Sequence, residues 1–221
     1  MKRPLWIPVV AAACAPVPAA TGAAPRVSEP PATASVTDSN GASTTLPPPG
    51  YGSLRQDEIS LEIVDGPLNV KVTPLAEEIT RLAAPDTYER LHALAASRAA
   101  EAAQRTESPG AELFLVSFFS REPNVEYRPE ELQLSHRGRT QRPAAILPLT
   151  TGWGRQLLQP QETQSAIYVF EPPFDYQLPL TVRYGVLQTD AWHRMVLQRI
   201  EEERTRVLSR AGAKGWSPHQ R

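Results

Sequence analysis

Residue types that carry catalysis occur throughout this chain, but they form no recognisable catalytic pattern. The sequence lacks a Gly-x-Ser-x-Gly motif, which would place a serine nucleophile on a sharp turn. The histidines are widely separated, and none has a second histidine or a cysteine at metal-ligand spacing: His92, His136, His193 and His219. The three glutamates at 201–203 would point about 100° apart on a helix, as on a solvated face. We therefore expect no enzyme activity, no cofactor and no metal.

Aromatic residues in two loop-like segments indicate binding instead. Trp153 and Arg155 belong to the segment Thr-Gly-Trp-Gly-Arg. Phe174 and Tyr176 belong to the segment Pro-Pro-Phe-Asp-Tyr. Both segments fall between expected strands, where binding residues concentrate, and tryptophan and tyrosine offer a large contact area with a polar tip. We expect these four residues to contact a protein or glycan partner; the alternative is that the rings close the ends of a hydrophobic core.

Composition excludes several classes of protein. Lysine and arginine number 23 and aspartate and glutamate 24 among 221 residues, a formal net charge of −1, which provides no global attraction for nucleic acid. Hydrophobic residues make up 41% of the chain, which is enough to build a core. The single cysteine rules out an internal disulfide framework and a cysteine-rich zinc site.

The N-terminus has the pattern of a bacterial export signal. Lys2 and Arg3 precede an apolar stretch at 5–13 that is too short to span a bilayer, and Cys14 follows three alanines. This arrangement resembles the lipobox of bacterial lipoproteins, with Ala11 where that family prefers leucine. The resemblance implies that residues 1–13 are removed as a signal peptide and that Cys14 is lipidated, which anchors the protein to a membrane on its extracytoplasmic side. Plain secretion, with Cys14 incidental, is the alternative.

Residues 14–50 are expected to form a lipidated cysteine followed by a disordered tether. Proline, alanine, serine and threonine account for 25 of the 36 residues from 15 to 50, and no aromatic residue is among them. Such a composition cannot bury enough apolar surface to offset its conformational entropy, and its proline runs favour extended polyproline II structure. We interpret the segment as a spacer between a membrane and a folded domain; a proline-rich ligand for a partner is the alternative.

Hydrophobic alternation predicts that residues 51–211 form a mainly β domain. The alternating segments at 59–63 and 68–72 form either a hairpin or one bent strand. The run at 113–119 is apolar on both faces and is therefore expected to be a central strand, and the segment 178–186 alternates most regularly. Seven or eight short strands joined by proline and glycine turns indicate an antiparallel β-sandwich.

Two helical regions are expected in addition to the strands. A helical insertion at about 73–105 would begin with Thr73 as N-cap, and its second helix would begin at Asp86. A C-terminal helix at about 190–211 carries an apolar stripe that is expected to dock on the sandwich. Residues 212–221 are expected to form a flexible tail.

The corner Leu-Gln-Pro-Gln-Glu at 158–162, with the strands expected after it, resembles part of a known family. In bacterial extracytoplasmic immunoglobulin-like domains, a corner of the type Leu-x-Pro-Gly-Glu leads into a strand rich in phenylalanine and valine, and a hydrophobic closing strand follows. Here the corner leads into 165–170 and then 178–184, with Gln161 in place of the usual glycine, and the similarity covers about 113–186. The resemblance implies an immunoglobulin-like β-sandwich and a binding or scaffolding role, and it transfers no site residue.

These observations together predict a membrane-anchored extracytoplasmic lipoprotein. Its folded domain is expected to bind or scaffold a protein or an envelope component, without nucleic acid. Two alternatives remain open at this stage: a structural or assembly factor in envelope biogenesis, and a secreted hydrolase acting on envelope polymers, which would need paired carboxylates in a cleft.

Overall fold

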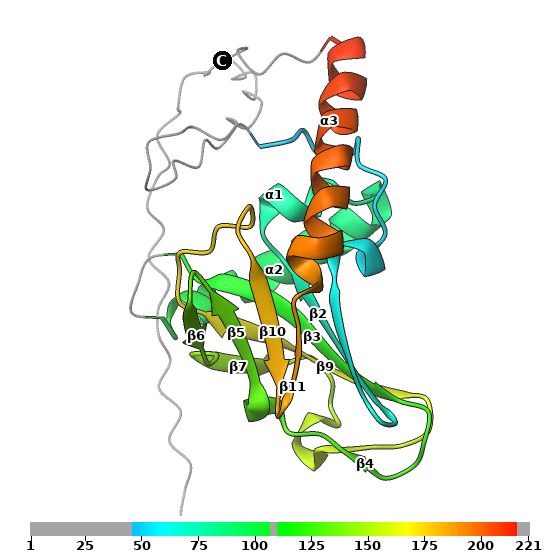
Figure 1. The fold of residues 1–221 in the computed structure, drawn as a ribbon, viewed down its shortest axis with the longest axis vertical. Helices are drawn as coiled ribbons and strands as arrows, with labels where there is room; N and C mark the ends of the chain where they lie inside the picture. The colour runs from blue at the N-terminus through cyan, green and yellow to red at the C-terminus, as the bar shows by residue number, and fades with distance from the viewer. Residues whose placement is uncertain (1–45, 107–109, 216–221) are drawn as a thin grey trace, which may run out of the picture. The chain divides into compact units, whose positions relative to one another are not determined.

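The computed structural model describes residues 46–106 and 110–215 of the chain (Figure 1). The expected signal peptide, the lipidation candidate Cys14, the tether up to residue 45 and the last part of the tail lie outside the described residues. Within the described residues, no helix combines the length and the apolar character needed to cross a membrane.

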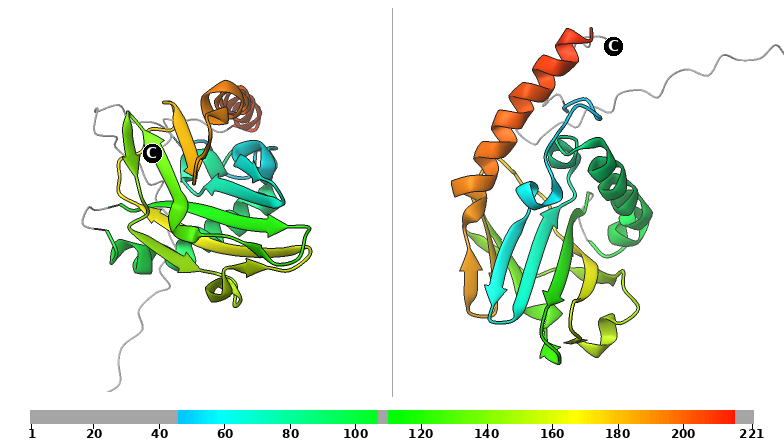
Figure 2. Two further views of the ribbon diagram at one scale, coloured as in Figure 1. Left: turned by 60° about the horizontal axis from the view of Figure 1, so that its bottom comes forward. Right: turned by 90° about the vertical axis from the view of Figure 1, so that its right-hand side faces the viewer.

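Two antiparallel sheets face each other and enclose the core (Figures 1 and 2). The first sheet contains, in spatial order, β1 (Leu61–Asp65), β2 (Leu68–Pro74), β3 (Glu112–Ser120), β9 (Glu162–Phe170) and β7 (Ala145–Pro148). The second sheet contains β11 (Leu187–Thr189), β10 (Leu180–Tyr184), β5 (Leu132–His136) and β6 (Arg139–Gln141). A separate short pair joins β4 (Val125–Glu126) to β8 (Leu157–Leu158). The prediction of a mainly β, antiparallel sandwich is confirmed.

The centre of the first sheet is apolar on both faces, as the run at 113–119 predicts. Phe114 and Phe118 of β3 are fully buried and contact aromatic rings inside the sandwich. Leu113 and Leu115 alternate with them and are also buried, because helix α2 (Pro85–Ala103) lies along the outer face of this sheet (Figure 2). β3 pairs with β2 on one side and with β9 on the other, and so it is central.

Strands β1 and β2 form a hairpin rather than one bent strand, and Ile59 lies in the short 3-10 helix η1 (Gln56–Ile59) before it. β1 and β2 pair from Leu61–Val72 to Asp65–Leu68, which leaves a loop of two residues. Gly66, at the first loop position, has φ +56°, a conformation that glycine adopts at little steric cost.

The helical insertion starts later than its sequence pattern predicts. Thr73 and Pro74 pair with residues of β3, so β2 continues through the predicted N-cap, and the first helix, α1 (Glu77–Thr80), is a single short turn. Pro85 opens α2 in its first turn, and Ala84 takes the N-cap position without a side-chain hydrogen bond. The prediction of an N-cap at Thr73 is therefore wrong, whereas the second helix begins one residue before the predicted start at Asp86.

The segment at 178–186 is not one strand. β10 ends at Tyr184, the chain reverses at Gly185, where φ is +56°, and β11 returns alongside β10. Val186 is 96% exposed in this turn. The alternation extended the predicted strand too far because Val186 is apolar but lies in the turn. Tyr184 pairs with Leu187, so these two residues, three apart, share a face and the phase of the alternation changes at the turn.

The C-terminal helix begins with a π-helical turn, η4 (Trp192–Val196), and continues as α3 (Leu197–Ala213). Trp192 and Val196 are buried against the sandwich, whereas the later turns of α3 project past the ends of the sheets (Figures 1 and 2). We call this end of the sandwich the helix end. The opposite end, which carries the β1–β2 loop, β4 and β8, is called the tip end.

Candidate functional site

The four residues expected to contact a partner lie at opposite ends of the sandwich. Trp153 and Arg155 form the short helix η3 (Trp153–Arg155) at the tip end, whereas Phe174 and Tyr176 lie in the loop from β9 to β10 at the helix end (Figure 1). Strand β9 runs between the two ends and, at about 3.3 Å per residue, is roughly 26 Å long. The structure therefore does not bring the four residues into one contact surface.

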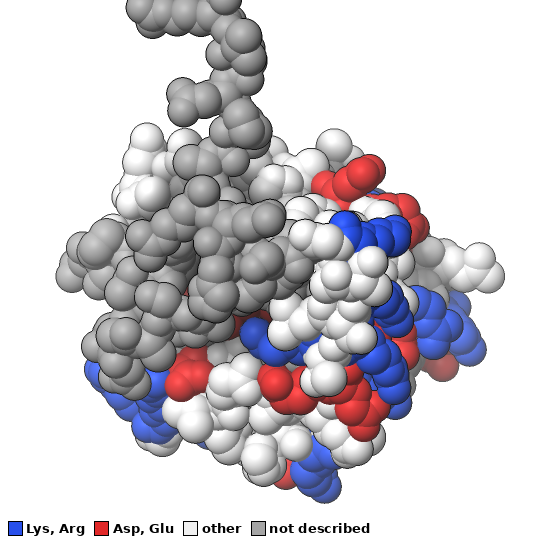
Figure 3. Space-filling view, turned by 90° about the horizontal axis from the view of Figure 1, so that it is seen from above, with Lys and Arg blue, Asp and Glu red and all other residues white. Residues whose placement is uncertain are grey.

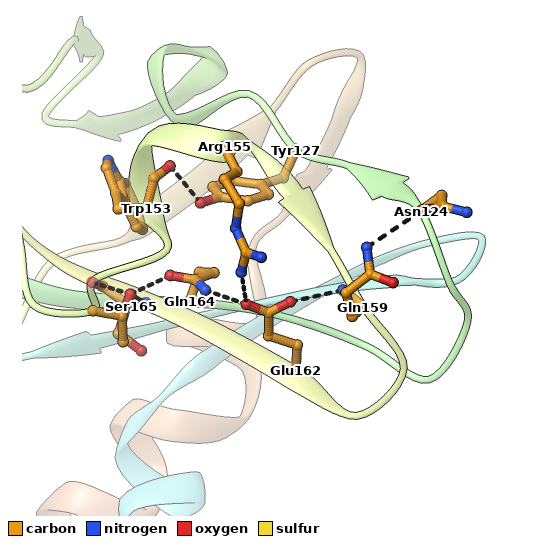
Figure 4. Close-up of polar contacts among 9 residues, drawn as sticks. Asn124, Tyr127, Trp153, Arg155, Gln159, Glu162, Gln164 and Ser165 are labelled. Carbon is orange, nitrogen blue, oxygen red and sulfur yellow. Dashed lines mark hydrogen bonds and ion pairs between the residues drawn. The ribbon is translucent and has the colours of Figure 1, made fainter.

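Trp153 is a core residue in spite of its Gly-Trp-Gly setting. Its side chain is 9% exposed, and its ring lies 5.8 Å from that of Phe118 and 5.5 Å from that of Tyr127. The Tyr127 hydroxyl donates a hydrogen bond of 2.9 Å to the Trp153 carbonyl oxygen (Figure 4). These contacts place the indole in the closure of the core at the tip end.

Arg155 is the exposed member of the same helix, and a carboxylate next to it compensates its charge. The guanidinium, whose side chain is 57% exposed, forms a salt bridge with Glu162 at the start of β9 (Figure 4). Glu162 also accepts hydrogen bonds from the Gln159 backbone amide at 2.8 Å and from the Gln164 side chain. The hydrogen bond from the Gln159 amide has the largest effect on Glu162, and together these donors hold the pKa of Glu162 below its usual value.

This corner has an unusual backbone conformation at Gln161. Its φ is +59°, in the left-handed region, and its amide donates a hydrogen bond of 2.8 Å to the Ser120 carbonyl oxygen. Glycine is favoured in this conformation because it lacks a Cβ. This chain nevertheless carries glutamine at that position.

At the helix end, Tyr176 is buried and Phe174 is half-buried. Tyr176 is 3% exposed; its hydroxyl donates to Glu112 Oε2 at 2.9 Å, and its carbonyl oxygen accepts the Trp192 indole N–H at 3.0 Å. Phe174 is half-buried, and its ring stacks on that of His136 at 5.2 Å. Burial raises the pKa of Glu112 to about 7. This loop therefore fastens β3 to the root of the C-terminal helix.

A groove of about 400 Å³ opens at the tip end and was not foreseen from the sequence. It lies between the β1–β2 loop, β4, the turn leading into β5 and the end of β10. Its charged and hydrogen-bonding lining side chains are Asp65, Glu126, Arg128, Glu131 and Tyr184. They come from segments far apart in the sequence, among them the end of strand β10, so no local pattern marks them as one site. The one sequence feature that could have indicated this groove is the excess of acidic over basic residues in the turns of the tip end.

The chain enters the described domain at the other end. We call residues 46–55 the arm. The Tyr51 carbonyl oxygen accepts a hydrogen bond of 2.7 Å from Arg210 of α3, and the Ser53 hydroxyl donates to Glu203 at 2.8 Å. Glu203 is fully buried and pairs with Arg210 at 2.8 Å. The arm is thus held against α3 at the helix end.

The surface around the helix end carries both signs of charge. Seen from that end, lysine and arginine side chains are interspersed with aspartate and glutamate side chains on the visible face (Figure 3).

Among the described residues, no group of three or more histidine, cysteine, aspartate or glutamate side chains is placed to hold a metal ion. No family model, curated protein or solved structure matches the chain.

Proposed function

We propose that the chain is an extracytoplasmic lipoprotein, anchored through acylated Cys14, whose immunoglobulin-like β-sandwich binds a protein or envelope component at the tip end. The observation that carries this proposal is the placement of the arm and the groove at opposite ends of the sandwich. A tether that joins the domain at the helix end leaves the tip end as the part that can point away from the membrane.

Three features of the sequence support the anchor. Positive residues, an apolar stretch and Cys14 follow one another in the order of a lipobox signal. Each buried methylene of an acyl chain contributes about 0.8 kcal/mol, so two chains hold a protein stably at a membrane. The segment that follows has the length and composition of a spacer.

The immunoglobulin-like assignment within this proposal is supported by the corner before β9. The left-handed residue at Gln161 lies where the family places glycine, and the corner leads into a buried central strand. Domains of this shape bind or scaffold more often through their ends and loops than through a cleft.

The anchor is tested by expressing the full chain with Cys14→Ser. We expect the wild-type protein to incorporate labelled palmitate, to lose its first 13 residues and to partition into the detergent phase, and the variant to do none of these. Ser28→Ala, in the tether, is the matched control and should behave as wild type. Unchanged processing and membrane retention of the Cys14→Ser protein would contradict the proposed anchor.

A further inference from the structure

The groove at the tip end has carboxylates that the rest of the described domain leaves unpaired. Glu131 forms a salt bridge of 3.1 Å with Arg128. Asp65 and Glu126 face the same groove, and within the described residues neither makes a salt bridge or a side-chain hydrogen bond. With three carboxylates and one guanidinium, the lining carries an excess of two negative charges.

Tyr184 adds a hydrogen-bond donor to this lining. It is 5% exposed, and its hydroxyl oxygen accepts the Arg128 backbone amide at 2.9 Å. No hydrogen bond from its own proton to another described residue is found. Burial raises the pKa of Tyr184, so the hydroxyl keeps this proton at neutral pH. The proton is available to a carbonyl oxygen, which a peptide backbone supplies and a simple amine does not.

Apolar side chains flank the acidic residues of the groove along the chain. Pro67, which is exposed, and Val125, which is half-buried, line the groove beside Asp65 and Glu126. The side chain of lysine combines an aliphatic stem with an ammonium group and can therefore contact apolar and acidic surface at once.

The electrostatic surroundings of the groove have the same sign as its lining. Outside the groove lining, the turns of the tip end, at 65–68, 120–131, 149–162 and 184–187, contain three carboxylates and two arginines, an excess of one negative charge. An excess of negative charge at one end raises the association rate of a cationic partner and disfavours an anionic one.

We infer that this groove binds a lysine-bearing extended segment of a protein partner, with the ammonium group between Asp65 and Glu126 and a backbone carbonyl oxygen on the Tyr184 hydroxyl. The inference rests on the binding role proposed above and names the chemistry of the partner. It does not depend on the anchor, because Cys14 lies outside the groove and outside the described residues.

The test uses the full chain in non-ionic detergent and a fluorescein-labelled peptide of four Gly-Lys repeats, with binding followed by fluorescence anisotropy. Each exposed ion pair contributes about threefold to affinity, so we expect Asp65→Asn with Glu126→Gln to weaken binding about tenfold. The matched control is Glu122→Gln with Glu130→Gln, which removes the same charge from the same end outside the groove. We expect it to weaken binding less than twofold.

A second readout locates the bound ammonium group. Zero-length carbodiimide cross-linking joins a lysine to a carboxylate only when the two are in contact. We expect mass spectrometry to find the peptide on Asp65 or Glu126 in preference to Glu122 or Glu130. Thermal melting of each variant checks that the folded state is retained.

The outcomes separate this inference from the proposed function. The inference would be overturned if the groove variant and the control variant lost affinity for the lysine peptide equally, or if the wild-type protein did not bind that peptide. Neither result would affect the palmitate and detergent experiments that test the anchor. Binding of a Gly-Gln or Gly-Glu peptide that is lost in the groove variants would keep a binding role for the tip end and reject the cationic partner.

Discussion

Glu112 should make the stability of this domain depend on pH in an unusual direction. Burial raises its pKa in the folded state from 4.5 to about 7. The folded state therefore binds the proton more tightly than the unfolded state does. The resulting stabilisation is fully present below about pH 4.5 and is lost as the pH rises through about 7. At 1.36 kcal/mol per pKa unit, the loss amounts to about 3 kcal/mol.

Glu112→Gln isolates this contribution. Glutamine has the same shape, stays uncharged and keeps an oxygen that can accept the Tyr176 hydroxyl. We expect the free energy of unfolding of the wild-type protein, relative to that of the variant, to fall by about 3 kcal/mol between pH 4.5 and pH 8.5. Tyr176→Phe removes the hydrogen bond that lowers the pKa of Glu112, and so it should move the midpoint of this dependence to higher pH.

The assay is urea unfolding at a series of pH values, followed by tryptophan fluorescence. The quantity to plot is the free energy of unfolding of the wild type minus that of Glu112→Gln. His136 is present in both proteins, and its pH-dependent contribution to stability, which is opposite in sign to that of Glu112, cancels in this difference. Burial lowers the pKa of His136, so its contribution is present above about pH 6.5 and is lost as the pH falls. A wild-type minus variant difference that stays constant from pH 4.5 to pH 8.5 would refute the reasoning.

Two backbone positions give further predictions. A Cβ on Gly52 would lie 2.2 Å from the Leu82 carbonyl oxygen, so Gly52→Ala should lower the free energy of unfolding by about 3 kcal/mol or more in urea titrations. Gly154→Ala meets open space and should change it by less than about 0.5 kcal/mol; equal effects would contradict the packing of the arm. Gln161→Gly should raise the free energy of unfolding by about 1 kcal/mol, because the backbone at this residue has φ +59°. The control Gln188→Gly, in strand β11, should lower the free energy of unfolding. A loss of stability in Gln161→Gly would contradict the left-handed conformation of this corner.

The sequence predicted those elements whose hydrophobic pattern reflects their burial. The run at 113–119 is central in the sheet, as its two apolar faces indicate, and the apolar run at 166–170 lies in the buried strand β9. The N-cap at Thr73 failed because pairing with Leu115 stabilises an extended backbone there, and this long-range interaction overrides a local helix signal.

The candidate site was harder to predict for two physical reasons. Glycines around Trp153 are typical of an exposed loop, but the ring contacts Phe118, which is distant in sequence. The groove lining joins Asp65 to Tyr184, and only the folded topology brings these residues to the same end. Neither the packing of Trp153 on Phe118 nor the meeting of Asp65 and Tyr184 in one groove leaves a periodic or local signal in the sequence.

The arm has a mechanical consequence if the domain is held by its N-terminus, as proposed. Leu54 donates its amide to Leu82 and accepts the Ala84 amide, at 3.1 and 2.8 Å, while Arg210 holds the Tyr51 carbonyl oxygen from the other side. Because the arm precedes β1 in the chain, a pull along the arm loads these bonds before it reaches the sheet. The force is shared between the helical insertion and α3 before it reaches β1, and the sheets can stay intact while the attachment bears the strain.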